Sequence, residues 1–152
     1  MFKRAKAKFL ISDTELCLKG LLGLPPDAQK DYANDILRNI FALIADAERS
    51  SDGGKEANKV HLQLAKDRRH KALSAGASDH SHPEWAAAAL VEGWVMANGG
   101  AAGREAADTI TGLIFGWVHE TLSDSEFSAV EKSFGLNRRT SGSVGGRPRG
   151  IR

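Results

Sequence analysis

Apolar residues recur every three or four positions through most of the chain, which is the period of an amphipathic α-helix. The clearest case lies between Pro26 and Arg49, where apolar and charged residues occupy different sides of the helical wheel. No segment shows the alternation of apolar and polar residues that is typical of a half-buried β-strand. The pattern therefore predicts an all-α fold, a compact bundle of five to six helices.

Capping residues, prolines and glycines predict where these helices begin and end. Three serine–x–x–glutamate capping boxes, in which each side chain satisfies a free backbone amide of the first turn, are expected to open helices. They are Ser12–Glu15, Ser81–Glu84 and Ser123–Glu126. The expected helices cover about 12–22, 26–49, 55–73, 82–98, 104–122 and 123–134.

A local pattern is shared by the fourth and fifth predicted helices. Gly93–Trp94 and Gly116–Trp117 occur at an offset of 23 residues, within similar apolar surroundings. Glycine lets two backbones approach closely, and tryptophan buries a large apolar area beside it. The pattern would suit an antiparallel helical hairpin with both tryptophans buried, and the spacing of Gly112 and Gly116 also favours close packing. The favoured interpretation is that both segments are core helices with similar packing needs.

Composition restricts the class of protein. The chain has 152 residues, of which 41% are hydrophobic and 26% charged, and this is typical of a single globular domain. Cys17 is the one cysteine, so no internal disulfide can form, and we expect it in the core. The apolar stretch after the basic N-terminus, residues 9–11, is too short for a signal peptide. Glu92 interrupts one longer apolar run and Asp108 precedes the other, so neither reaches the length of a membrane span. A cytoplasmic protein without a membrane partner is expected.

The formal net charge of +2 conceals a strong segregation. Residues 1–8 and 55–71 each carry +4, residues 137–152 carry +5, and the rest of the chain carries −11. We expect a basic N-terminal arm (1–9), an all-helical domain (10–136) and a flexible tail rich in arginine, glycine and serine. Such asymmetry favours a polyanionic partner or self-association, and a homo-oligomer is compatible with it.

The third predicted helix provides a basic surface. Lys55, Lys59, Lys66 and His70 are spaced by four, seven and four residues, which places them on one face of a helix. Such a row could contact the phosphate backbone of nucleic acid, and this contact would not depend on the base sequence. The full set of predicted nucleic-acid-binding residues is Lys55, Lys59, Lys66, Arg68, Arg69, Lys71, Arg138, Arg139, Arg147 and Arg149.

The tail contains Gly145-Gly146-Arg147-Pro148-Arg149-Gly150. This segment resembles an AT-hook, an element built around a Gly-Arg-Pro core with flanking basic residues, although Gly145 stands where a basic residue is usual. The resemblance covers about six residues and implies insertion of Arg147 and Arg149 into the minor groove of A·T-rich DNA. The alternative interpretation is a solvated arginine-containing tail or a protein-docking segment.

Histidines and carboxylates offer a candidate metal site. Asp79, His80, His82 and Glu84 lie close together in sequence, and His119 is near the end of the fifth predicted helix. The chain has no His-Glu-x-x-His motif and no paired cysteines, so we expect no metal, no cofactor and no catalytic residue. Whether His80, His82 and His119 converge is left open by the sequence.

Three functions therefore compete. The leading hypothesis is a small non-enzymatic binding protein that engages nucleic acid, or a nucleoprotein complex, through its basic segments. The alternative is a protein-interaction module, such as a regulator or inhibitor that docks on a larger assembly through its acidic helical body. A metal-dependent enzyme is the third.

Overall fold

The structure, a computed structural model, describes residues 2–77 and 79–136, with side chains from residue 5 onward. The predicted all-α fold is confirmed: the described part contains six α-helices and no strand. The helices are α1 (Phe2–Leu22), α2 (Pro26–Arg49), α3 (Lys55–Ser74), α4 (Pro83–Met96), α5 (Arg104–Thr121) and α6 (Asp124–Ser133), with a π-helical turn, η1 (Ala97–Ala101), after α4.

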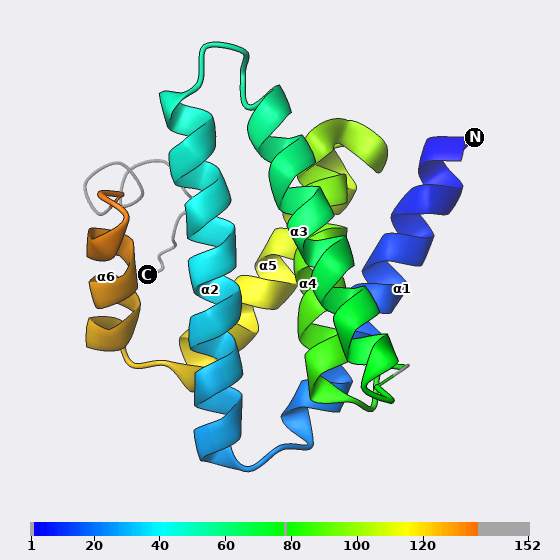
Figure 1. The fold of residues 1–152 in the computed structure, drawn as a ribbon, viewed down its shortest axis with the longest axis vertical. Helices are drawn as coiled ribbons and strands as arrows, with labels where there is room; N and C mark the ends of the chain where they lie inside the picture. Colours follow the sequence, from blue (N-terminus) through cyan, green and yellow to red (C-terminus); the bar gives the residue numbers. More distant parts are fainter. Residues whose placement is uncertain (1, 78, 137–152) are drawn as a thin grey trace.

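Consecutive helices run in alternating directions (Figure 1). Helices α2, α3 and α4 lie next to one another, and α1 packs against α4 and α5. Helix α5 crosses behind α2, while α6 covers the other side of α2. None of the helices within residues 2–77 and 79–136 combines the length and the apolar composition of a membrane span.

The core is formed by the apolar sides of these helices. Ile36, Leu37, Ile40 and Phe41 of α2 are almost completely buried, as the period of that segment predicted. The other large apolar side chains that are fully buried come from α1, α4, α5, α6 and the residues after α6: Leu21, Leu90, Ile110, Ile114, Val118, Val130 and Leu136. Phe41 also makes edge-to-face contacts with Phe115 and Phe127, which join α2, α5 and α6.

The prediction that a helix begins at Ser12 is wrong. Helix α1 starts ten residues earlier, at Phe2, and Ser12 lies inside it. The segment before Ser12 contains no proline or glycine and is rich in alanine and lysine, which are strong helix formers. The helix therefore continues through the capping sequence, and the basic residues at the N-terminus belong to its first turns.

One of the two remaining capping boxes is confirmed. Ser123 Oγ accepts a hydrogen bond from the Glu126 amide at 3.1 Å, and Glu126 Oε1 accepts one from the Ser123 amide at 2.8 Å. The box predicted at Ser81 is wrong, because Ser81 Oγ instead donates to Asp79 and Glu84 bonds to Tyr32. A neighbouring carboxylate thus engages the serine and a long-range partner engages the glutamate, so neither half of the cap forms.

The predicted glycine-lined hairpin is also wrong, although both tryptophans are in the core. Trp94 and Trp117 are 6% and 5% exposed, and their indole N–H groups donate to Thr111 and Gln29. Both α4 and α5 pack more extensively on α1 than on each other. Gly93 faces Leu10 and Thr14 of α1, whereas Gly112 and Gly116 have open space where a Cβ would project. The shared pattern reflects similar core positions, not a direct contact between the two glycine faces.

Candidate functional site

The exposed side of α3 carries three lysines, Lys55, Lys59 and Lys66, which we call the lysine face. Helix geometry places them within about 40° of one another around the axis and spreads them over about 16 Å along it. Lys55 and Lys59 are exposed, and Lys66 is half-buried. None of the three forms an ion pair with another described residue. Their ammonium groups are therefore available to an external anion.

Arg68, on the same helix, is engaged inside the molecule. Its guanidinium lies 2.6 Å from Asp35 and 3.3 Å from Glu84, so it bridges α2 and α4. Tyr32 donates a hydrogen bond of 2.6 Å to the second oxygen of Glu84. That bond, with the Arg68 charge, holds the pKa of Glu84 below its usual value, while burial and Glu84 raise the pKa of Tyr32 to about 12.

Arg69 is engaged in the same way on the other side of α3. Its Nε donates to Glu92 at 2.7 Å and a terminal nitrogen donates at 3.3 Å, which makes a two-pronged contact with α4. The guanidinium carbon also lies 5.9 Å from the centre of the Trp85 ring, within the range of a cation–π contact. The two arginines predicted to bind nucleic acid in this helix thus hold α3 to its neighbours.

The other predicted nucleic-acid-binding residues are placed as follows. Lys71 is exposed near the end of α3, away from the lysine face, on the side that carries Val60 and Leu64. Arg138, Arg139, Arg147 and Arg149, together with the segment that resembles an AT-hook, lie outside the described residues. The structure therefore supports a smaller set of available cations than the sequence predicted.

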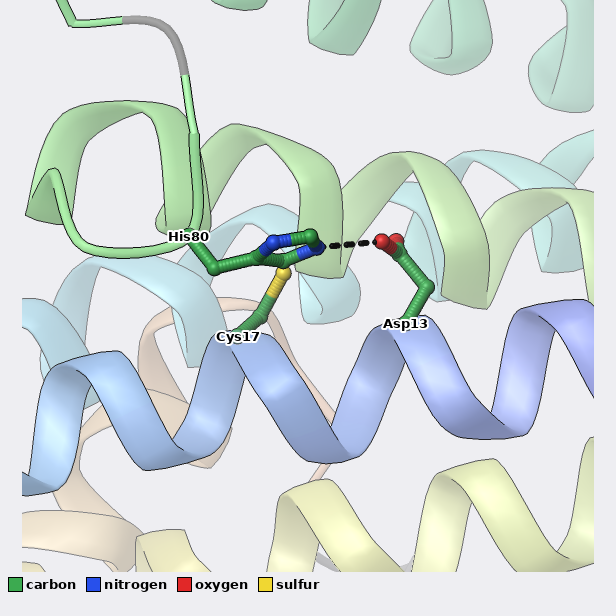
Figure 2. A group of neighbouring side chains, drawn as sticks. All are labelled: Asp13, Cys17 and His80. Atoms are coloured by element: carbon green, nitrogen blue, oxygen red, sulfur yellow. Dashed lines mark hydrogen bonds and ion pairs between the residues drawn. The ribbon is translucent and has the colours of Figure 1, made fainter.

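A second group of chemically active side chains is formed by Asp13, Cys17 and His80 (Figure 2). One ligand atom from each lies within 4.8 Å of the other two. His80 Nε2 is 2.7 Å from Asp13 Oδ1, across 67 positions of sequence. Cys17 is completely buried beneath the imidazole, and this burial, with the nearby Asp13 carboxylate, raises the pKa of its thiol well above the usual range.

The histidines singled out from the sequence do not converge. His82 is exposed at the start of α4, and His119 stacks on Phe127 of α6 with ring centres 4.4 Å apart. Only His80 joins a group of three potential ligands within the described part of the chain. Sequence reasoning missed its partners, although the four-residue spacing of Asp13 and Cys17 places them on one helix face, which is a usable signal.

Comparisons with known proteins give no relative. No protein-family model, no curated protein and no solved structure matches the chain.

Proposed function

We propose that this is a non-enzymatic cytoplasmic protein that binds the phosphate backbone of nucleic acid through the lysine face of α3. The observation that carries the proposal is that the arginines of α3 form internal ion pairs and its lysines form none within the described part of the chain. Arg68 and Arg69 are paired with carboxylates of α2 and α4, whereas Lys55, Lys59 and Lys66 have no such partner among the described residues. Cations left without internal partners are the groups that can replace the counterions of a polyanion.

The chemistry of the surface supports a backbone contact and not the reading of bases. Lysine offers a mobile point charge, which suits phosphate, and α3 contains no Phe, Tyr or Trp for stacking on bases. Three such contacts would make binding depend steeply on salt: about 40-fold weaker binding is expected between 50 and 200 mM salt. The basic segments before residue 9 and after residue 136 would add to this dependence.

A mobility-shift titration tests the proposal. Duplex DNA, single-stranded DNA and RNA of equal length are titrated with the full chain at about 50 and about 200 mM salt. We expect retention at the lower salt and a steep loss at the higher. No retention of any of the three at the lower salt, where electrostatic binding is strong, would overturn the proposal.

A protein-docking role is the second candidate, and one observation favours it. Val60 and Leu64 lie one turn apart on α3 and are 46% and 56% exposed. Exposed apolar side chains at this spacing are typical of helix faces that pack on another protein. Binding of a protein partner through this pair would depend little on salt, which distinguishes it from binding of nucleic acid.

A further inference from the structure

The Asp13–Cys17–His80 group combines three ligand types that Zn²⁺ accepts: a carboxylate oxygen, a thiolate sulfur and an imidazole nitrogen. In a tetrahedral zinc site the ligand atoms are about 3.3–3.7 Å apart, given metal–ligand distances of about 2.0–2.2 Å for oxygen and nitrogen and about 2.3 Å for sulfur. The three atoms here already lie within 4.8 Å of one another, and the closest pair is 2.7 Å apart. Shifts of about 1 Å, within the range of side-chain rotation, would complete the geometry.

Two of the three ligands are placed by a rigid element. Asp13 and Cys17 are one turn apart on α1, so their side chains project from the same face (Figure 2). Cys17 is completely buried, and the side chains of Asp13 and His80 are 19% and 32% exposed. The thiol is therefore the innermost member of the group, and solvent contacts the group through the partly exposed Asp13 and His80 side chains.

The third ligand is held by a turn that is docked on α1. The Asp79 carboxylate accepts hydrogen bonds from the Ser81 amide and hydroxyl, which fixes the backbone on the C-terminal side of His80. The His80 carbonyl oxygen occupies the space where a side chain at Gly20 would begin, 2.0 Å from the position of a Cβ. The Trp85 and His80 rings pack edge to face, with ring centres 5.1 Å apart. His80 is thus positioned from three directions.

We propose that Asp13, Cys17 and His80 bind one Zn²⁺ ion, with water in the fourth position, and that the ion fastens the connection between α3 and α4 to α1. Zinc takes the place of the Cys17 thiol proton, which passes to solvent, and of the proton between His80 Nε2 and Asp13, which moves to Nδ1 of a neutral imidazole or leaves an imidazolium for solvent. A site with sulfur and nitrogen donors disfavours Mg²⁺ and Ca²⁺, which require oxygen ligands. This proposal is independent of nucleic-acid binding.

Metal titration of the full chain, purified without a histidine tag and freed of metal by a chelator, tests the proposal. Zn²⁺ alone is titrated calorimetrically, and Co²⁺ alone is titrated by absorption, because a cobalt–thiolate bond gives an intense charge-transfer band in the near ultraviolet. We expect one ion per chain and a thiolate band. Since Cys17 is the one cysteine of the chain, the band in wild-type protein must come from it.

Variants identify the other ligands. Asp13→Asn, Cys17→Ala and His80→Gln should each weaken Zn²⁺ binding by at least about 100-fold, more than the loss of an outer hydrogen-bond partner usually costs. His82→Gln, which changes an exposed histidine outside the group, should leave the affinity unchanged. If wild-type protein gives no thiolate band with Co²⁺, or if His82→Gln weakens Zn²⁺ binding as much as His80→Gln does, the proposal is overturned. The cobalt spectrum of the wild type decides the question even if a variant fails to fold.

Discussion

At Gly20, the structure and local helix propensity make opposite predictions for how replacement with alanine changes the stability of the protein. Gly20 lies inside α1, where replacing glycine with alanine ordinarily stabilises a helix by about 0.5–1 kcal/mol. A Cβ at this position, however, would lie 2.0 Å from the carbonyl oxygen of His80 and 3.1 Å from its carbonyl carbon. These are backbone atoms, so the turn that contains His80 would have to retreat as a unit by about 1 Å or more to reach a tolerable separation.

The magnitude follows from the contacts that such a retreat would weaken. Overpacking of this kind costs about 1–3 kcal/mol. The 2.7 Å hydrogen bond between His80 and Asp13 would be lost as well, at about 1 kcal/mol, because both groups stay partly exposed and recover contact with water. Set against the gain in helix propensity, Gly20→Ala should lower the free energy of unfolding by about 1–3 kcal/mol.

Urea unfolding followed by circular dichroism measures this change, and α5 supplies the matched control. Gly116 is an exposed glycine inside a helix, with no atom within 4 Å of the position of its Cβ. Gly116→Ala should therefore raise the free energy of unfolding by about 0.5–1 kcal/mol. A Gly20→Ala protein as stable as the wild type, or stabilised like Gly116→Ala, would refute the docking of the His80 turn on α1.

Three further predictions concern the core, acid stability and the C-terminal segment. Replacing the buried Trp94 with alanine should cost about 3–5 kcal/mol in urea unfolding, and a cost below 1 kcal/mol would place its ring outside the core. The hydrogen bond from Tyr32 and then the charge of Arg68 hold the pKa of Glu84 below its ordinary value. The ionised Glu84 therefore stabilises the folded state fully above that ordinary value, and this stabilisation is lost as the pH falls through the lowered pKa. The melting temperature of Glu84→Gln should accordingly fall less steeply than that of the wild type between about pH 5 and pH 3, and parallel curves would contradict this. Replacing Arg147 and Arg149 with alanine should remove any preference for A·T-rich duplex in competition assays, and a preference that persists would exclude the groove-inserting interpretation.

The elements that could be predicted from the sequence are those specified by nearby residues. Pro26 opens α2 because a proline loses nothing in a first turn, and the Ser123–Glu126 box opens α6 within four residues of sequence. The box predicted at Ser81 does not form, because its residues are engaged by other partners. Its glutamate is bonded to Tyr32, 52 positions away, and that partner has no trace in local sequence.

The same limit applies to the candidate sites. A count of charges treats the arginines and lysines of α3 alike, yet Arg68 and Arg69 find carboxylates on α2 and α4 once the helices pack. Sequence spacing placed the lysines on one face, but it gave no means of distinguishing paired cations from available ones. Likewise, the approach of His80 to Asp13 depends on how the connection after α3 docks on α1, which is a property of the tertiary structure.

The salt dependence of duplex DNA binding by two matched double variants tests the central claim most directly. Lys59→Gln with Lys66→Gln removes two charges from the lysine face, whereas Lys19→Gln with Lys132→Gln removes two exposed charges from α1 and α6. Each phosphate contact contributes about 0.9 to the slope of log affinity against log salt. We predict a slope reduced by about 1.8 in the first variant and unchanged in the second. Equal reductions in the two variants, or no reduction in the first, would contradict the assignment of nucleic-acid binding to the lysine face.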